Sequence, residues 1–355
     1  MTAETKLYQY EVTCAGGFED VLVDEIRSLL GKRVEGLREE RGEVGRIFFQ
    51  YEGSPRKLLE LECAAGIAAI VAQMHDVTVG KPGLERISQG VGQLPLPAMT
   101  RLARLANEGI DAAGYQLRVR QRGSHRFEVS DTEAALVAAL SAQGLSPSHA
   151  GFDLEFRLQK RRAQLKLSLR HASHAGAIEQ RGIPAAMVAS IVTMLGLDDT
   201  DDLLLIHGHP EAAAAARRIC GSQVACVRRA RPGTSQIMSP PPDQAACPGT
   251  GPRSIVVGAD DHLPIQAGSM TAAILVTADD EATMPGSAAD RLSQAVACVA
   301  EEGVIAALVP RSDAFAARLP QWGLPVEVMG ALPVYVRRRR WALFLLSRLD
   351  LLQLA

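Results

Sequence analysis

The sequence lacks a net charge of either sign, a cysteine framework and any long apolar run. Its 38 Lys and Arg residues nearly balance 40 Asp and Glu residues, which excludes a chain that binds nucleic acid through an overall basic character. None of the six cysteines forms a C-x-x-C pair, and this argues against a zinc site or a disulfide framework and favours reduced thiols. No apolar run approaches the roughly 18 residues of a membrane span, and the polar start of the chain does not resemble a signal peptide. We therefore expect a cytoplasmic protein with no membrane partner.

The composition is that of a folded globular protein, since apolar residues make up 47% and charged residues 22% of the chain. These shares exclude a mainly disordered chain, a collagen-like chain and a long coiled coil. A length of 355 residues predicts two or three domains at about 150 residues each. The near-neutral total hides a basic middle segment, because residues 101–170 carry 12 Lys and Arg against 7 Asp and Glu. Such a segment indicates a polyanion partner, although an ordinary solvated surface has the same signature.

Residues 1–79 have the pattern of a compact, ferredoxin-like α+β module. A helix is expected over 18–30, with Gly31 at its C-cap, and a second helix begins at Ser54-Pro55. The apolar run 64–74 has the length of a core helix. Short strands are expected over 8–13, 46–51 and 75–79.

Residues 80–174 form a second expected unit. A helix over 96–108 precedes an alternating strand over 116–120, whose Arg118 and Arg120 lie opposite Leu117 and Val119. Ser130 and Glu133 fit a capping box at the start of a further helix. Two more strands, 152–158 and 164–169, flank a basic hairpin tip at Lys160, Arg161 and Arg162.

Residues 178–355 alternate between strands and helices, which indicates a doubly wound, Rossmann-like sheet. The run 203–206 is a continuous apolar strand of the kind buried on both faces of a parallel sheet. A proline-rich stretch over 231–254 interrupts the pattern and is expected to be a flexible loop. Further strands are expected over 224–227, 255–257, 272–276 and 304–309, with a closing antiparallel pair over 333–336 and 342–346.

The ordered features resemble RNA methyltransferases that carry an N-terminal THUMP region. The opening YEVTCAGGFEDVLVDEIRSLLG is similar to the family's first strand, turn and helix. LRVRQRGSHRFEVSDTEAALVAAL and FDLEFRLQKRRAQLKLSL resemble the THUMP core, and IEQRGIPAAMVASIVTMLGL resembles the helix that enters the methyltransferase domain. The resemblance covers nearly the whole chain and implies an α/β and α+β fold, with a ferredoxin-like module, a THUMP domain and a Rossmann-like methyltransferase-type sheet.

The resemblance implies that the THUMP region binds structured RNA, either tRNA or rRNA, and no DNA. The local charges agree, because several cations on one strand, one loop and one hairpin tip would contact phosphates. The candidate RNA-binding residues are Arg118, Arg120, Arg122, His125, Arg126, Lys160, Arg161 and Arg162.

The resemblance also implies an S-adenosylmethionine site in the second half, where the motifs depart from the family pattern. The turn that holds the methionine part of the cofactor is His207-Gly208-His209-Pro210, which keeps one glycine. Asp260 or Asp261 stands near the position that reaches the adenine, shifted by one residue. Asp279 and Asp280 are the candidate catalytic residues. They follow the strand after which the family carries the residues that hold the target amino group, but the paired prolines and the aromatic residue of that motif are absent.

These departures predict an RNA-binding member of the family whose methyltransferase domain is impaired. S-adenosylmethionine is its cofactor only if the site is retained, and no metal site is assigned. An active S-adenosylmethionine-dependent RNA methyltransferase acting on guanine N2 is the alternative, and a protein-binding scaffold without an RNA role is a second alternative. The run Arg337–Arg340 fits either an RNA contact or a hairpin turn that faces water.

Overall fold

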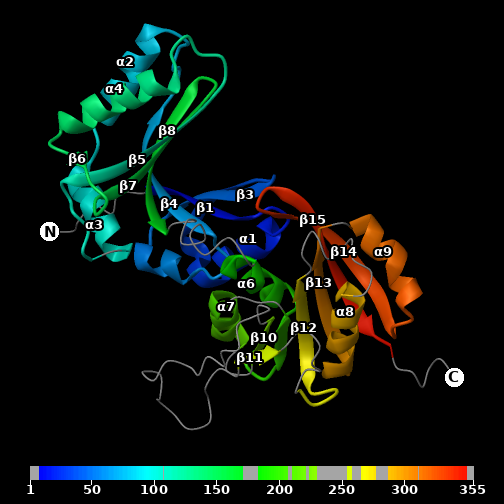
Figure 1. Cartoon of the computed structure of the whole chain (residues 1–355). Helices are drawn as coiled ribbons and strands as arrows, with labels where there is room; N and C mark the ends of the chain where they lie inside the picture. Colours follow the sequence, from blue (N-terminus) through cyan, green and yellow to red (C-terminus); the bar gives the residue numbers. More distant parts are fainter. Residues whose placement is uncertain are drawn as a thin grey trace. The chain divides into compact units, whose positions relative to one another are not determined.

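A computed structural model describes residues 8–106, 108–170, 183–206, 210–220, 224–229, 254–257, 265–276, 287–310 and 312–349. The chain folds into two compact units, which we describe separately (Figure 1). The first unit comprises residues 1–13, 23–40 and 46–173, and the second comprises 14–22, 41–45 and 174–355. No helix in the described part of the chain is long and apolar enough to cross a membrane.

The first half of unit 1 has the ferredoxin-like strand order. Where a second helix was expected from Ser54-Pro55, the chain forms only the short 3-10 helix η2, Pro55–Glu60. The first helix, α1, ends in the 3-10 turn η1, Gly31–Arg33, and Gly31 has a φ of 65°. In space the four strands follow the order β2-β3-β1-β4, which confirms the predicted ferredoxin-like topology. The remaining elements are β1 (Tyr8–Ala15), α1 (Glu19–Leu30), β2 (Val34–Glu40), β3 (Val44–Tyr51) and β4 (Gly66–Met74).

Strand β4 corrects two expectations. The apolar run 64–74 is a strand rather than a core helix, because β4 lies between β1 and β8 (Arg162–Arg170) and is covered on both faces. A strand buried in this way carries no alternation that distinguishes it from a buried helix. The expected strand over 75–79 is absent, and those residues are a loop. Strand β2 was not expected, since it is a polar edge strand.

The second half of unit 1 continues the same sheet, through an antiparallel pairing of β4 with β8. The full order is β2-β3-β1-β4-β8-β7-β5-β6, so the expected boundary at residues 79 and 80 falls inside one sheet. Helix α4 is capped by Glu128 and Asp131 rather than by the expected Ser130 and Glu133. The elements are α2 (Lys81–Val91), α3 (Leu96–Ala106), β5 (Gly114–Arg122), α4 (Val129–Ser141), β6 (Ser146–Pro147), β7 (Phe152–Gln159) and β8 (Arg162–Arg170).

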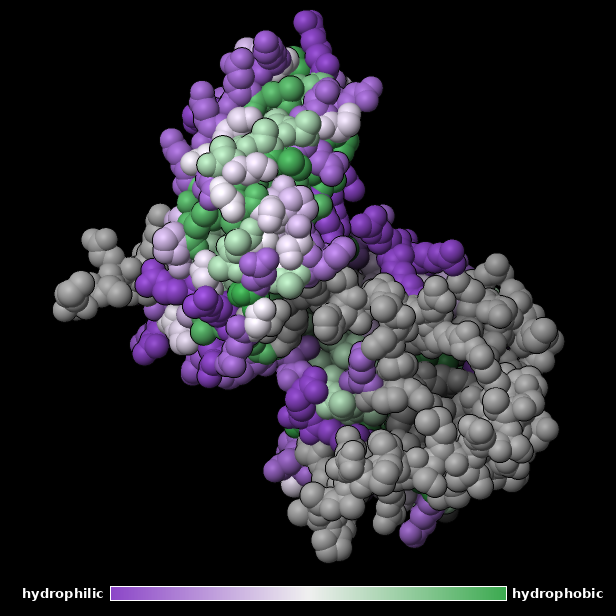
Figure 2. All heavy atoms as spheres, turned by 60° about the vertical axis from the view of Figure 1, so that its left-hand side comes forward, coloured by the Kyte–Doolittle hydropathy of each residue, from purple (hydrophilic) through white to green (hydrophobic). Residues whose placement is uncertain are grey.

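The large sheet has one apolar and one polar face in its second half. Along β7 the apolar residues are buried and their neighbours face the other side, in the alternation that a half-covered antiparallel or mixed sheet requires. Hydrophilic residues predominate along the upper edge of the face seen in Figure 2. This arrangement leaves the charged side chains of β5, β7 and β8 together on the face away from the apolar core.

Unit 2 is a doubly wound α/β sheet, as predicted. Its strand order is β11-β10-β9-β12-β13-β15-β14, with β9 paired in parallel to both β10 and β12. Strand β15 runs antiparallel to β13 and β14, which confirms the closing pair. The strands are β9 (Leu203–Ile206), β10 (Val224–Arg229), β11 (Ser254–Val257), β12 (Met270–Val276), β13 (Val299–Val309), β14 (Val326–Val336) and β15 (Arg339–Arg348). The helices are α6 (Ala185–Met194), α7 (Pro210–Cys220), α8 (Ser287–Cys298), α9 (Ser312–Arg318) and the 3-10 helix η4 (Leu319–Trp322).

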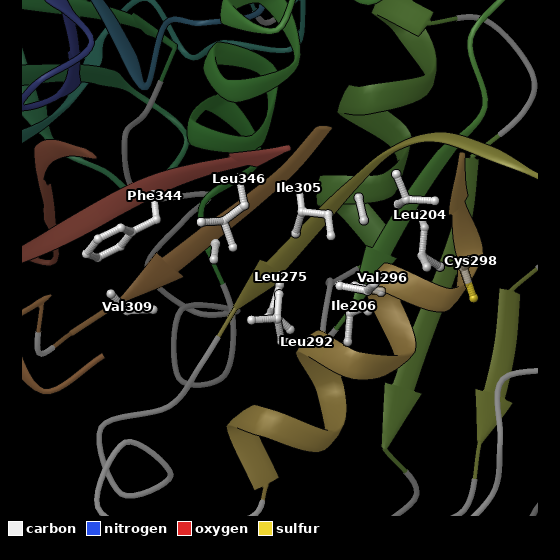
Figure 3. Packing of buried hydrophobic residues seen from close by; sticks show 14 of the residues in the cluster. Leu204, Ile206, Leu275, Leu292, Val296, Cys298, Ile305, Val309, Phe344 and Leu346 are labelled. Atoms are coloured by element: carbon white, nitrogen blue, oxygen red, sulfur yellow. The ribbon is translucent and has the colours of Figure 1, made fainter. Parts of the chain in front are cut away.

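The core of unit 2 forms where α8 covers the sheet (Figure 3), and Phe315 of α9 belongs to the same cluster. Leu292 and Val296 of α8 pack against Ile206 and Leu275, which come from the two central strands. All four residues of β9 are buried, as expected for a strand with parallel neighbours on both sides. This core holds in place the carboxyl ends of β9 and β12, after which the expected cofactor-binding residues follow in the sequence. The mixed α+β first unit and Rossmann-like second unit confirm the predicted fold class.

Candidate functional site

Three chain segments that are far apart in the sequence meet at one end of the large sheet. The N–H of Lys160 donates to the carbonyl of Arg122 at 3.0 Å, and the N–H of Val77 donates to the carbonyl of Arg161 at 3.0 Å. The N–H of Arg126 donates to the carbonyl of Val79 at 2.7 Å. These bonds hold the loops 75–79 and 122–126 and the β7–β8 turn in one frame, which we call the basic end.

The local sequence explains this geometry. Gly123 has a φ of 121°, a conformation that a residue with a side chain rarely adopts, so the chain leaves β5 sharply after Arg122. Asp76 and Lys160 also have positive φ values, 59° and 54°. The β7–β8 turn is only two residues long, because Gln159 pairs with Arg162 across the hairpin. The turn therefore points Lys160 and Arg161 away from the sheet.

The basic end carries a concentrated positive charge. Its five long cationic side chains are all exposed: Arg122, Arg126, Lys160, Arg161 and Arg162. Arg161 lies 3.4 Å from the carboxylate of Asp76, but both side chains are largely exposed and such a pair is weak in water. Within the described ranges no carboxylate lies within ion-pair distance of the other four cations. The basic end is thus open to an anionic partner.

Arg118 and Arg120 have a different environment from the basic end. Strand β7 runs parallel to β5, and its acidic residues lie on the same polar face. A guanidinium nitrogen of Arg118 is 3.9 Å from the carboxylate of Asp153, and Nε of Arg120 is 3.4 Å from the carboxylate of Glu155. These two arginines therefore have intramolecular counterions.

His125 packs inside the loop rather than pointing outward. Its ring stacks at a tilt on Phe127, with centroids 5.0 Å apart. Neither ring nitrogen is exposed or has a hydrogen-bond partner among the described residues. A Cβ at Gly123 would lie 3.3 Å from Nε2 of His125, so the glycine makes room for the ring. The ring supports the loop that presents Arg122 and Arg126.

A buried ion network, which no sequence pattern marks, lies on the same polar face. The side chains of Lys166 and Glu11 are only 3% and 7% exposed and form an ion pair. Nε of Arg46 lies 3.6 Å from the other oxygen of Glu11. Burial, together with the nearby Arg157 cation, lowers the pKa of Arg46, while Glu11 acts in the opposite direction. The network ties β1 and β3 to β8 and so joins the two halves of the sheet.

Two further carboxylates hold the first helix in place. Glu19, from the AGGFE motif, is buried and accepts hydrogen bonds from the N–H groups of Gly17 at 2.8 Å and Gly42 at 3.4 Å. Glu25 accepts hydrogen bonds from the N–H groups of Glu62 and Cys63, at 2.6 and 3.1 Å, and burial raises its pKa. These hydrogen bonds give Glu19 and Glu25 a structural role in positioning α1.

Unit 2 provides a second candidate edge, at the carboxyl ends of β9 and β12. The strand order reverses between these two neighbours, because the chain proceeds from β9 to β10 on one side while β12 and β13 lie on the other. Ile206 and Leu275 are register partners, so the two strands end side by side. In open α/β sheets ligands bind outside the carboxyl ends of the strands at such a reversal.

The residues expected to bind cofactor and target base follow these strand ends in the sequence but lie outside the described residues. They are His207, Gly208, His209, Asp260, Asp261, Asp279 and Asp280. Helix α7, which follows residues 207–209 in the sequence, begins at Pro210, which has no N–H group to offer at the helix N-terminus. The acidic loop 198–202 has hydrogen bonds within itself, since the carboxylate of Asp198 accepts hydrogen bonds from Thr200. No group of three or more metal-ligating side chains occurs in the part of the chain that the structure describes.

The cysteines agree with the expectation of reduced thiols where the structure describes them. Cys14, Cys63, Cys220 and Cys298 are buried thiols that form no disulfide bond. Burial raises the pKa of Cys220 to about 11 and also raises that of Cys298. These thiols are not activated nucleophiles.

Solved structures of similar fold are methyltransferases or candidate methyltransferases. TrmN from Thermus thermophilus matches with a TM-score of 0.68 and 16% identity, over 96% of this chain and 100% of that chain. The candidate methyltransferase SMU.472 in complex with SAH matches with a TM-score of 0.59 and 14% identity, over 97% and 99%. A predicted N6-adenine-specific DNA methylase from Listeria monocytogenes matches with a TM-score of 0.57 and 12% identity, over 96% of each chain.

Sequence comparisons give no such match. No family model matches the chain, and no curated protein is similar to it. At identities this low the structural similarity establishes the fold, which extends over both units and nearly the full length of each chain.

Proposed function

We propose that this protein is an RNA-binding member of the THUMP methyltransferase family, with tRNA or rRNA as its ligand and an impaired methyltransferase domain. Residues 80–174 act as the THUMP RNA-binding domain, after an N-terminal module over 1–79 and before a methyltransferase-type domain over 178–355. The observation that carries the RNA-binding part is the basic end. Four exposed cations without a carboxylate partner in the described chain, and a fifth in a weak pair, stand on a backbone frame held by three hydrogen bonds.

Such a cluster of cations suits the closely spaced phosphates of a nucleic acid backbone. Arginine binds phosphate through two parallel N–H groups, and each contact releases condensed counterions from the nucleic acid. Recognition would depend on the spacing of the phosphates rather than on base edges, as is usual for structured RNA. Arg118 and Arg120 would contribute less, because Asp153 and Glu155 already neutralise them.

The second half of the proposal concerns the cofactor edge, whose residues do not fit S-adenosylmethionine well. The segment that follows β9 in the sequence keeps a single glycine, Gly208, and Pro210 removes a donor at the start of α7. Nucleotide-binding α/β sheets place a carboxylate for the ribose about 20 residues after the glycine turn. Here β10 ends at Arg228 and Arg229. We therefore propose that the fold persists without efficient methyl transfer.

The test of RNA binding uses the full-length protein and a matched control. The variant Arg122→Gln/Lys160→Gln/Arg162→Gln removes three cations of the basic end. The control Arg27→Gln/Lys32→Gln/Arg56→Gln removes three exposed cations from α1, η1 and η2. Fluorescence anisotropy with unmodified tRNA, an rRNA hairpin and a DNA duplex of equal length measures the affinity.

We expect the basic-end variant to lose RNA affinity by at least tenfold while the control changes less than twofold. Equal losses in both variants would point to nonspecific charge attraction and contradict the assignment. Tighter binding of the DNA duplex than of either RNA would overturn the choice of RNA.

An active S-adenosylmethionine-dependent RNA methyltransferase, acting on guanine N2, is the second candidate, favoured by the match to a protein that is complexed with SAH. Isothermal titration calorimetry with S-adenosylmethionine decides between the two. We expect no binding at cofactor concentrations up to about 1 mM. Binding in the micromolar range, with transfer of a labelled methyl group to tRNA, would establish the active enzyme instead.

A further inference from the structure

The hairpin that joins β14 to β15 ends in an unusual turn. Val336 and Arg339 are register partners, so the turn consists of two residues, Arg337 and Arg338. Both have positive φ values, 51° and 64°. This is the geometry of a type I′ turn, in which both central residues are left-handed. The hairpin belongs entirely to unit 2 (Figure 1).

The residues in this turn are not those that its backbone favours. Type I′ turns prefer Asn-Gly, because asparagine and glycine tolerate the left-handed region at little cost. Two consecutive arginines carry a steric penalty at each position. Strain of this kind persists where the side chains serve another purpose, and here the side chains are cations.

The charge around the hairpin makes this choice of residues stand out. Residues 171–355 carry 15 Lys and Arg against 18 Asp and Glu, so this half of the chain is acidic. Four of those cations occupy consecutive positions, Arg337–Arg340, and all four are exposed. For Arg338 and Arg340 the described residues include no carboxylate within ion-pair distance. Two of the four, Arg337 and Arg338, form the strained turn itself, and the other two begin β15.

We infer that the tip of the β14–β15 hairpin is a second contact for the RNA phosphate backbone, made by Arg338 and Arg340. This inference rests on the proposed RNA-binding function and adds to it a contact on the methyltransferase-type unit. Arg338 lies at the apex of the turn, and Arg340 follows on β15 with Tyr335 as its register partner. The two guanidinium groups would each neutralise one phosphate, independently of base sequence.

The test exploits the strain of the turn. In the variant Arg338→Gly/Arg340→Thr, glycine suits the left-handed position and threonine suits the strand, so the hairpin keeps its conformation. The melting temperature is expected to stay the same or rise. Affinity for tRNA is expected to fall, by about 5-fold for each lost phosphate contact at 0.1 M salt if each contributes a slope of about 0.7. The charge-retaining variant Arg338→Lys/Arg340→Lys should keep most of the affinity.

The outcomes separate this inference from the proposed function. If Arg338→Gly/Arg340→Thr binds tRNA like the parent protein while the basic-end variant does not, the hairpin contact is refuted and the RNA-binding function stands. If neither set of variants changes the affinity, both fail. If the lysine variant loses as much affinity as Arg338→Gly/Arg340→Thr, neutralisation of charge is not the source of the affinity, and the inference of two charge-neutralising phosphate contacts is refuted. The control Arg27→Gln/Lys32→Gln removes two cations elsewhere and should have little effect.

Discussion

The buried network of Glu11, Lys166 and Arg46 predicts an asymmetric response to mutation. Glu11 is the central member, because its carboxylate contacts Lys166 on one side and lies 3.6 Å from Arg46 on the other. Replacement Glu11→Gln leaves the buried Lys166 cation without its counterion and also removes the carboxylate from Arg46. Breaking a buried pair in this way costs about 3–5 kcal/mol. The replacement Lys166→Met leaves the pair of Glu11 and Arg46 intact and adds an apolar side chain of similar length, so we expect a smaller loss of about 1–2 kcal/mol.

The double variant Glu11→Leu/Lys166→Met tests the same reasoning from the other side. Removal of both charges leaves Arg46, whose side chain is partly exposed, with access to water. Replacement of a buried pair by apolar residues is often neutral or stabilising, so the double variant should be more stable than Glu11→Gln. The coupling between the two positions is expected to exceed 1 kcal/mol.

Urea denaturation followed by far-ultraviolet circular dichroism measures these differences. The two tryptophans, Trp322 and Trp341, both lie in unit 2, so their fluorescence provides an internal control for that unit. Equal losses for Glu11→Gln and Lys166→Met, or losses below 1 kcal/mol for both, would refute the central position of Glu11. Additive effects in the double variant would refute the coupling.

Three further predictions concern the loop, the core and the thiols. Gly123→Ala should destabilise the protein by about 1–3 kcal/mol and weaken tRNA binding, because the φ of 121° at this position is unfavourable for a residue with a side chain. Thermal unfolding measures the stability, and fluorescence anisotropy measures the tRNA affinity. An unchanged melting temperature would contradict the predicted loss of stability. Leu275→Ala should lower the free energy of unfolding by about 2–5 kcal/mol in urea titrations, because the leucine is fully buried between the strands and α8. A loss below 1 kcal/mol would mean that the surrounding side chains close the cavity left by the substitution. Burial raises the pKa of Cys220 to about 11 and also raises the pKa of Cys298. Both thiols should therefore react slowly with a thiol reagent at pH 8 and faster as the pH rises, which peptide mass spectrometry can follow. Rapid labelling at pH 8 would refute the burial of these thiols.

The second unit could be predicted from sequence because its central strands are continuous apolar runs. Leu203–Ile206 and the strands that pair with it are flanked in the sequence by polar or glycine-containing segments, which indicates both the type of these elements and their limits. The run 64–74 has the same apolar character but extends over a length that fits a short helix. Only its two antiparallel partners, β1 and β8, decide that it is a strand.

The candidate site shows a similar division. The basic residues themselves are visible in the sequence, and so is the hairpin tip over Lys160 and Arg161. The neutralisation of Arg118 and Arg120 is not, because their counterions lie on a parallel strand about 35 positions later. The pair of Lys166 and Glu11 spans 155 positions and leaves no local pattern. Local spacing therefore located the charges, while the pairing of strands determined which of them are available.

The dependence of tRNA affinity on salt tests RNA binding at the basic end most directly. Each phosphate contact contributes a slope of about −0.7 to −0.9 to the plot of log K against log salt concentration. Titrations from 50 to 300 mM KCl should therefore give a slope about 2 units smaller in magnitude for Arg122→Gln/Lys160→Gln/Arg162→Gln than for the parent protein. The control Arg27→Gln/Lys32→Gln/Arg56→Gln should keep the parent slope. Identical slopes for the parent and the basic-end variant would show that these residues make no phosphate contacts and would contradict the account.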